Sequence, residues 1–339
     1  MIFSYKIRQF FRRALRAMLV LALILGISLL FFAVWLRRFV VYTPQGVRLD
    51  FNATVPVGPG AVPSRPDKLD IFIDYWQPEE TRPDDPVIVQ QRLEGYYVPS
   101  EMLQKNIPAL REQLALLPAG TAVLLDLKSF WGYFYYSSDF GIHSDSYDIG
   151  AVDALIADLA AFDLHLIARL PALRDYEYAR NHTSCGLPTS KGYLWTDDSG
   201  CYWLDPTDDG TLTHLINVAK ELRDMGFDEV VFKDFYVPES NKIVFRSDRK
   251  AAIEAAAATL VAAFPSGDFT VSFVGYRTDL VLPEGNCRLY LEGVAAVDVQ
   301  DVLAMTQVAD KRMQVVLLCQ TNDTRYDVCG TLRPLDLAH

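Results

Sequence analysis

The chain of 339 residues lacks the motifs of several common enzyme classes. Its five histidines form no His-x-x-x-His pair, so a zinc peptidase or a metal-dependent deacetylase has little support. It has no Gly-x-Ser-x-Gly elbow and no P-loop. No glycine-rich phosphate turn follows the first expected strand, which argues against a dinucleotide-binding sheet. We therefore expect neither a metal nor a cofactor.

Cysteine is scarce, and its five copies include no paired Cys-x-x-Cys ligands. Outside a cell membrane, oxidation favours short-loop disulfides. We expect Cys185 to pair with Cys201 and Cys319 with Cys329, each bond contributing about 3 kcal/mol on the chain-entropy model. Cys287 is then left over, and we expect it to be buried and reduced.

Basic residues are rare beyond the N-terminus. The first 48 residues hold eight Lys or Arg and no acid, which leaves 24 basic against 43 acidic residues and a net charge near −19. Phosphate backbones require a basic face, so we expect no nucleic-acid partner.

One uncharged run of twenty residues, Ala17–Leu36, is long enough to cross a bilayer core of about 30 Å as a helix. The basic residues before it favour a cytoplasmic tail at 1–16 and an extracytoplasmic remainder. A cleaved signal peptide is the alternative, but the run ends without a small-x-small cleavage site. We therefore expect a single-pass membrane anchor.

Prolines are frequent in residues 37–86, which predicts an extended stalk between the anchor and a folded domain. Residues 69–76 alternate between apolar and polar side chains, as in an edge strand. The remaining residues, 87–339, suffice for one α/β barrel, which commonly needs about 250.

Strand and helix patterns alternate through this domain, which implies parallel strands with crossover helices. Strands are expected at Leu93–Val98, Ala122–Leu127, Leu164–Leu170, Glu229–Phe235, Phe269–Val274, Arg288–Leu291 and Gln314–Cys319. Helices are expected at Pro108–Leu117, Ala151–Phe162, Thr211–Asp224 and Asp248–Phe264. An eighth strand has no clear pattern, and residues 297–308 fit either helix or strand. The order predicts a (β/α)8 TIM-like barrel.

Five segments match a known family in order over about 150 residues. They are Leu93–Pro99, Ala122–Lys128, Leu166–Leu170, Trp203–Pro206 and Gly226–Phe232. In them the chain resembles the bacterial glycoside-hydrolase-type family DUF4015, which implies a TIM barrel with a carbohydrate site.

Two departures from the family concern acids. Family members typically carry Lys-Asp-Asp after the second strand, where this chain has Lys128-Ser129-Phe130. They typically carry Phe-Asp-Tyr after the fourth strand, where this chain has Phe232-Lys233-Asp234. Either the second acid has moved to Asp234, or it has been lost.

Glycoside cleavage needs two carboxyl groups on either side of one bond. Asp126 and Asp234 each follow an apolar strand run, where barrels carry their chemistry, and form the favoured pair. We expect Val230 and Phe232 to point inward, which by alternation sends Asp234 inward as well. The alternative for Asp126 is an ion pair with Lys128 or Arg169. For Asp234 it is a rim salt bridge with Lys233.

Further candidates surround this pair. Asp205 is a third catalytic candidate, although an Asp before Pro is commonly a turn residue. Glu229 begins its strand and is expected to be structural. Candidate substrate-binding residues are Lys128, Trp131, Arg169, Trp203, Lys233 and Tyr236, the aromatic ones because rings offer sugars an apolar face.

The sequence predicts a membrane-anchored, extracytoplasmic glycoside hydrolase that acts on a polysaccharide or oligosaccharide of the envelope or environment. The alternative is a non-catalytic glycan-binding or scaffolding barrel, in which Lys233 marks a lost acid.

Overall fold

The computed structural model describes residues 40–43, 46–49, 90–265, 267–275 and 280–335. The chain divides into two compact units, Met1–Arg82 and Pro83–His339. The predicted anchor at 17–36 and the predicted edge strand at 69–76 lie outside the described residues. Within the described residues, no helix is long and apolar enough to cross a membrane.

In the first unit, the structure describes two short strands. Strands β1 (Val40–Thr43) and β2 (Gly46–Leu49) pair antiparallel, with Val40 opposite Leu49. This hairpin lies within residues 37–86, and the predicted stalk stays a prediction.

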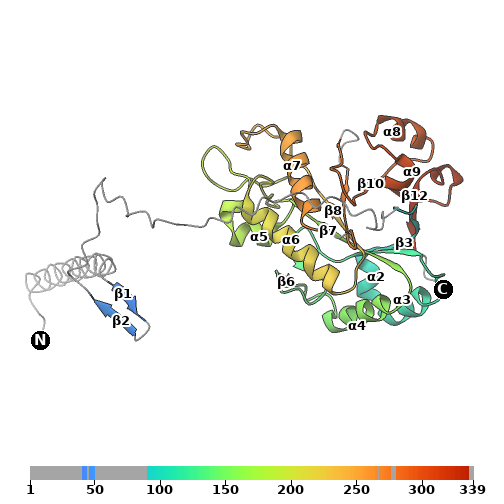
Figure 1. Cartoon of the computed structure of the whole chain (residues 1–339), viewed down its shortest axis with the longest axis horizontal. Coiled ribbons are helices and arrows are strands. Elements are labelled where there is room, and N and C mark those ends of the chain that lie inside the picture. The colour runs from blue at the N-terminus through green and yellow to red at the C-terminus, as the bar shows by residue number, and fades with distance from the viewer. Residues whose placement is uncertain (1–39, 44–45, 50–89, 266, 276–279, 336–339) are drawn as a thin grey trace, which may run out of the picture. The chain divides into compact units, whose positions relative to one another are not determined.

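The second unit is a closed barrel of eight parallel strands (Figure 1). In order around the barrel they are β3 (Glu94–Val98), β4 (Ala122–Asp126), β7 (His165–Pro171), β8 (Glu229–Lys233), β9 (Thr270–Val274), β10 (Leu289–Glu292), β11 (Val315–Leu318) and β12 (Gly330–Pro334). The TIM-like barrel predicted from the sequence is therefore confirmed.

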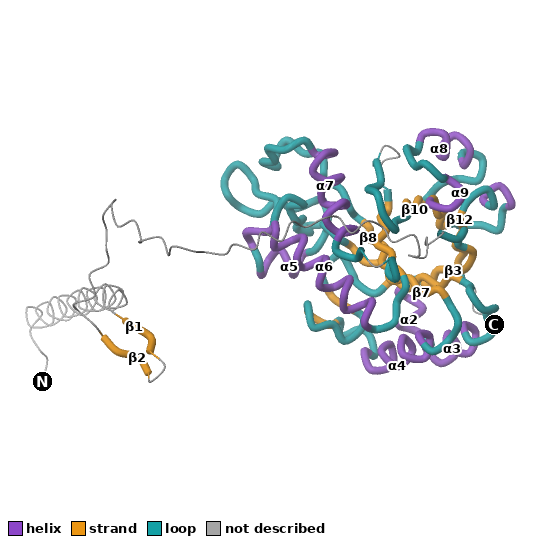
Figure 2. The backbone as a smooth tube through the Cα atoms, viewed as in Figure 1, coloured by secondary structure: helices purple, strands orange, loops and turns teal. Residues whose placement is uncertain are grey.

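Helices cover the outside of the barrel (Figure 2). They are α2 (Ser100–Lys105), α3 (Ile107–Leu114), α4 (Ile149–Ala160), α5 (Tyr176–Asn181), α6 (Asp209–Asp224), α7 (Arg249–Ala262), α8 (Val299–Met305) and α9 (Lys311–Gln314). Asp148, Asp208 and Asp248 cap α4, α6 and α7, each accepting a hydrogen bond from the backbone three residues on. The predicted helix over 211–224 is thus present, and Gly226 follows it with a φ of +97°.

The barrel closes through β12, the strand that has no clear pattern in the sequence. Gly330 pairs with Val316 of β11, and Thr331 pairs with Glu94 of β3. The strand contains Gly, Arg and Pro in five residues, so it lacks the β-branched run of its neighbours. The ambiguous segment at 297–308 contains helix α8.

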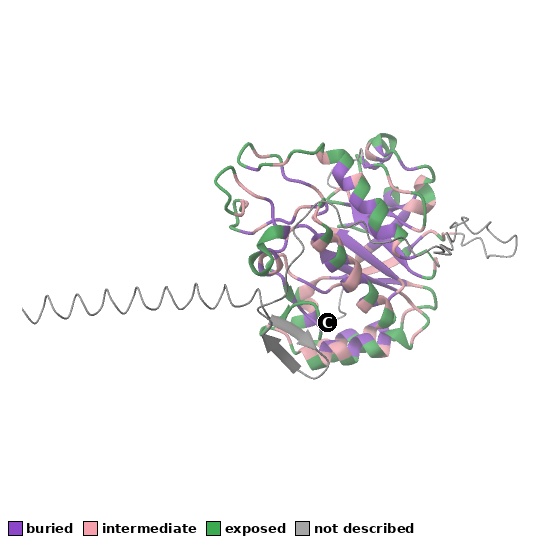
Figure 3. Ribbon diagram, turned by 60° about the vertical axis from the view of Figure 1, so that its left-hand side comes forward, coloured by how far each residue is buried: buried purple, intermediate pink, exposed green. Residues whose placement is uncertain are grey.

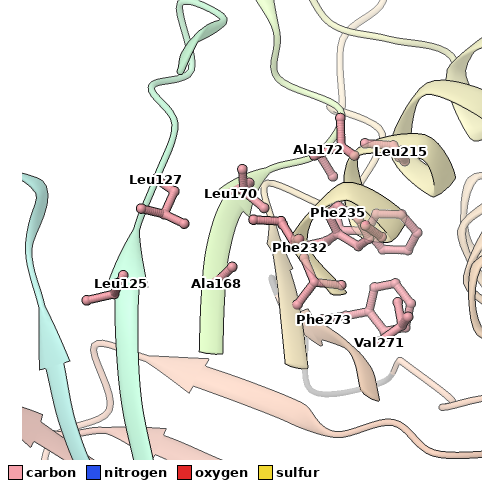
Figure 4. Close-up of a cluster of buried hydrophobic side chains, with 14 of the residues drawn as sticks. Leu125, Leu127, Ala168, Leu170, Ala172, Leu215, Phe232, Phe235, Val271 and Phe273 are labelled. Carbon is pink, nitrogen blue, oxygen red and sulfur yellow. The ribbon is translucent and has the colours of Figure 1, made fainter. Parts of the chain in front are cut away.

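Two layers of apolar side chains form the core. Figure 3 shows that the buried residues are concentrated in the strands of the barrel and on the helix faces that pack against them. Mainly strand residues fill the barrel interior, among them Leu124, Ile167, Val231, Tyr290 and Val316. The larger layer lies between the strands and the helices. Figure 4 shows part of it, with Phe235 and Ala172 near Leu215 of α6, and Leu125 and Ala168 farther along the same cluster.

The inward face of β8 differs from the prediction. Val231 belongs to the interior cluster, whereas Val230 and Phe232 pack toward the helices. Alternation therefore assigns Lys233, not Asp234, to the inward register of this strand. The prediction that Val230 and Phe232 point inward is wrong.

A buried ion pair occupies the opposite end of the interior. Glu229 is fully buried at the start of β8 and accepts hydrogen bonds from Arg288 (2.5 Å), Ser272 (2.6 Å) and Tyr290 (2.9 Å). Burial works to raise the pKa of Glu229, but Arg288 and His165 outweigh it, and the pKa is lowered. Glu229 is a structural residue at the N-terminal face of the barrel, as expected.

Candidate active site

The carboxyl ends of the strands carry a charged triad. Arg169 of β7 donates from Nε to Asp126 Oδ1 at 2.6 Å and from Nη2 to Asp126 Oδ2 at 2.8 Å. Its Nη1 pairs with Oε1 of Glu292. Burial works to lower the pKa of Arg169, but both carboxylates outweigh it, and the pKa is raised. One guanidinium thus links the ends of β4, β7 and β10.

Asp234 has an unusual backbone conformation at the end of β8. Its φ is +53°, and it is the only non-glycine residue with positive φ in the described part of the chain. Asp tolerates this left-handed region better than most residues, at a cost of order 1–2 kcal/mol. The conformation ends the strand alternation, so the direction of the Asp234 side chain no longer follows from the strand register. Such strain is concentrated at functional sites.

The environment of Asp234 favours its protonated form. Burial raises the pKa of this carboxyl. Lys233 and Arg174 oppose the shift, while the negative charges of Glu292 and Asp197 add to it, and the net direction is upward. Glu292, at the end of β10, is thus a carboxylate that acts electrostatically on Asp234.

A second ion pair flanks Asp234 from the loop that follows β7. Arg174 contacts Asp197 Oδ2 through Nε and Nη2, both at 2.7 Å, and Trp203 donates to the same oxygen at 3.1 Å. Burial works to raise the pKa of Asp197, but the bond from Trp203, the backbone of Cys201 and Arg174 outweigh it, and the pKa is lowered. Asp197 therefore stays ionised and leaves Arg174 paired.

Two predicted substrate-binding residues are buried instead. Lys128 is only 3% exposed, and its Nζ lies 2.5 Å from Oδ2 of buried Asp175 and 4.5 Å from the Phe134 ring centroid. Trp203 is also 3% exposed and packs edge-on against Tyr236 at 4.9 Å. Both predictions are corrected, because these side chains hold the loops and offer no face to a ligand.

Asp205 serves as a turn residue. Its Oδ1 accepts from the backbone nitrogen of Thr207 at 2.8 Å and from the Thr207 hydroxyl at 2.6 Å. This local pattern is the turn alternative anticipated for an Asp before Pro. We therefore remove Asp205 from the catalytic candidates.

The remaining predicted site residues lie at or near the mouth. Trp131 is 37% exposed in the loop after β4, whereas Arg169 is held by the two carboxylates. Lys233 and Tyr236 are half-buried next to Asp234 in sequence. Whether Trp131, Lys233 and Tyr236 contact a substrate stays a prediction.

The two predicted disulfides do not form, and all five cysteines are buried free thiols. Cys319 follows the end of β11, and Cys329 precedes the start of its parallel neighbour β12. The paired residues of these strands run from Val316 with Gly330 to Leu318 with Leu332, so Cys319 and Cys329 lie beyond opposite ends of the paired segment. Cys201 does not lie opposite Cys185 either. Next to the antiparallel bridge between Gly186 and Leu204, the residue opposite Cys185 is Asp205, whose backbone nitrogen donates to the Cys185 carbonyl.

Three residues at the mouth were missed by sequence reasoning. Glu292 carried a usable signal, since it follows the apolar run Leu289–Leu291 as Asp126 follows Leu124 and Leu125. Arg174 and Asp197 carried no such sequence signal, because they lie between β7 and α6 outside any strand pattern and meet only through folding. No cluster of three or more His, Cys, Asp or Glu suited to a metal occurs in the described ranges.

The family comparison agrees with this architecture. Residues 101–264 match a family model described as "DUF4015: Putative glycosyl hydrolase domain". The segment is DUF4015-like. The matched region runs from the second residue of α2 to two residues beyond α7, so it includes Asp126, Arg169 and Asp234 but ends before Glu292. The DUF4015 resemblance inferred from the sequence is confirmed, and no curated protein matches the chain.

The comparison with solved structures also finds matches. A variant of the GH36 α-galactosidase AgaA from Geobacillus stearothermophilus, bound to 1-deoxygalactonojirimycin, matches with a TM-score of 0.51 at 10% identity, over 73% of this chain and 39% of that one. A hypothetical protein from Ruminiclostridium thermocellum ATCC 27405 is 21% identical over 53% of this chain and 96% of its own, with a TM-score of 0.46. The present chain spans less than half of the α-galactosidase, and the likeness concerns the barrel fold alone.

Proposed function

We propose that this protein is a glycoside hydrolase in which Asp234 is the proton donor and Glu292 is the second carboxylate. The observation that carries the proposal is the pair of unlike acids at one barrel mouth. Asp234 is partly buried with a raised pKa, whereas Glu292 is 40% exposed and paired with Arg169. Glycosidases use such a difference, one carboxyl giving a proton and the other acting as nucleophile or base.

The proposed reaction begins with the proton of Asp234. In the protonated form, Asp234 passes it to the glycosidic oxygen as the bond to the anomeric carbon breaks. Glu292 then either attacks that carbon or removes a proton from a water that does. In this account Asp126 is not the second acid but fixes the Arg169 guanidinium, which in turn orients Glu292.

The proposed location remains the one expected from the sequence. The uncharged run at 17–36, with basic residues before it, supports a membrane anchor with a cytoplasmic N-terminus and an extracytoplasmic barrel. The substrate would then be a polysaccharide or oligosaccharide of the envelope or environment.

One observation favours the alternative of a non-catalytic glycan-binding barrel. Lys233 occupies the inward register at the place where family members typically carry an acid, as the register of β8 indicates. Binding without turnover would follow if Asp234 cannot reach the glycosidic oxygen.

A hydrolysis screen separates the two functions. The full-length protein is incubated with xylan, galactomannan, hydroxyethyl cellulose and alginate, and new reducing ends are counted. Cleavage of any of these that is lost in Asp234→Asn supports the hydrolase, whereas retention of a glycan without cleavage supports the binding barrel.

A further inference from the structure

The loop after β4 is fixed against the start of α5. The backbone nitrogens of Tyr176 and Glu177 donate to the carbonyls of Phe130 and Trp131, both at 3.2 Å. Gly132 has a φ of +90°, and a Cβ built on it would lie 2.5 Å from Oδ1 of Asp175. Any side chain at position 132 would therefore displace the loop, which identifies this segment as a tightly seated one.

Three aromatic rings from different segments contact one another here: Trp131 in this loop, Tyr176 at the start of α5, and Tyr202 before α6. The Trp131 and Tyr176 ring centroids are 5.5 Å apart at 68°, and those of Tyr176 and Tyr202 are 4.9 Å apart at 10°. We call Trp131, Tyr176 and Tyr202 the aromatic row. Trp131 is 37% exposed and the two tyrosines are half-buried, with Tyr202 packed against the core, so the row runs from the core to the surface.

The aromatic row leads to the proposed proton donor. The Cys201 thiol, next to Tyr202, donates to the Phe130 carbonyl at 3.1 Å, and Cys201 also lies within electrostatic reach of Asp234. The Arg174 guanidinium lies 4.0 Å from the Phe130 ring centroid and acts on Asp234 as well. Cys201 and Arg174, which both interact electrostatically with Asp234, thus hold Phe130, the residue before Trp131.

The charges beside the row are balanced. Arg174 is paired with Asp197, and Arg180 of α5 lies 3.3 Å from Glu177. A glycan with repeated carboxylates would have to compete with Asp197 and Glu177 for these cations. Flat rings, by contrast, pack directly against the apolar C–H faces of neutral sugars.

We propose that the exposed Trp131 ring, held by the rest of the aromatic row, is a subsite that binds a unit of a neutral polysaccharide chain beside Asp234. This inference rests on the proposed function for the identity of the mouth, but not for binding itself. Because the rings are held in place before the ligand arrives, binding loses little of their conformational freedom. Binding energy from such remote units can also be used at the reacting bond.

The test measures binding without requiring turnover. Full-length Asp234→Asn protein is run by affinity electrophoresis through xylan, galactomannan and hydroxyethyl cellulose, with alginate as the acidic comparator. Trp131→Ala is then added, and Tyr193→Ala is the matched control, since Tyr193 is 72% exposed and outside the row. Circular dichroism confirms that each variant is folded.

We expect Trp131→Ala to weaken retention by at least one neutral polysaccharide about tenfold, or about 1.4 kcal/mol, with Tyr193→Ala unchanged. Equal effects of the two substitutions, preference for alginate, or no retention on any neutral polysaccharide would each overturn the subsite. If Trp131→Ala loses binding while the wild type cleaves nothing, the subsite stands and the hydrolase proposal fails. If the wild type cleaves but Trp131→Ala binds normally, the hydrolase proposal stands and the subsite fails.

Discussion

Arg169 binds Asp126 in a bidentate arrangement, with both guanidinium-to-carboxylate distances below 3 Å. The Arg169 and Asp126 side chains are only 11% and 13% exposed, so water screens this pair poorly. A planar guanidinium that also reaches Glu292 fixes the relative positions of two carboxylates at the mouth. Asp126 therefore acts on the site through Arg169.

The first prediction concerns this pair. Arg169→Gln leaves Asp126 charged and poorly hydrated, so we expect a loss of about 3 kcal/mol in unfolding free energy. The double variant Arg169→Gln/Asp126→Asn removes that charge and should recover part of the loss, as urea denaturation can measure. Strict additivity of the two single effects would show that the residues are not coupled.

The second prediction concerns the opposite face of the barrel. Glu229→Gln leaves Arg288 buried without its partner, and we expect a loss of about 3–5 kcal/mol. Exposed Glu112→Gln serves as the control and should change little.

The contribution of Glu229 should also depend on pH. Because its pKa is lowered in the folded state, its stabilisation is fully present above the ordinary value of 4.5 and is lost as pH falls toward the folded value. Urea titrations at several pH values should show that the difference in unfolding free energy between wild type and Glu229→Gln becomes smaller below pH 4.5. A difference that stays constant across this range would contradict the assignment.

The third prediction is that the ionised Asp234 carboxylate lowers the stability of the folded state. Because its folded-state pKa is raised above 3.8, the ionised form is disfavoured by folding, and stability is lost as pH rises through the folded value. Asp234→Asn removes the charge, and Asn tolerates the left-handed backbone. We expect thermal unfolding of this variant at equal or higher temperature at pH 7, with any advantage shrinking toward pH 3.8.

Exposed Asp198→Asn is the control for this measurement and should track the wild type at each pH. A marked loss of stability in Asp234→Asn would mean that the ionised carboxylate holds the fold together.

The fourth prediction concerns the cysteines. Alkylation of the unfolded, unreduced protein followed by mass spectrometry should label all five residues, because each is a buried free thiol in the folded chain. A mass two hydrogens lower for a Cys185 and Cys201 peptide pair would restore the predicted disulfide.

The fifth prediction concerns the proposed anchor. Residues 37–339, produced without the uncharged run, should be soluble and folded, since acidic residues outnumber basic ones in this part of the chain. Complete partition of this fragment into membranes would contradict a single anchor at 17–36.

The barrel could be predicted because its strongest strands carry local signals. Val230, Val231 and Phe232 form a buried run, and Asp208 caps the helix before it. β12 could not be found in this way, because Gly330 and Pro334 carry no strand preference. Its place is set by pairing with β11 and β3, which are distant in sequence from each other.

The candidate site was less predictable for a related reason. Which face of β8 points inward depends on how the barrel closes, so Val231 and not Phe232 lies inside. The partners of Asp234 come from β10 and from the loop after β7, and no local pattern links Glu292 or Arg174 to it. Lys128 and Trp203 have suitable chemistry, but only the fold determines that they are buried.

The central claim is that Asp234 and Glu292 are the two working carboxyls. Its most direct test is the release of reducing ends from the polysaccharide that the wild type cleaves, by Asp234→Asn, Glu292→Gln and Asp205→Asn proteins shown to be folded. We expect the first two to lose about 10²–10⁴-fold in rate and the turn variant Asp205→Asn to retain activity. Wild-type rates in Asp234→Asn or Glu292→Gln would contradict the account.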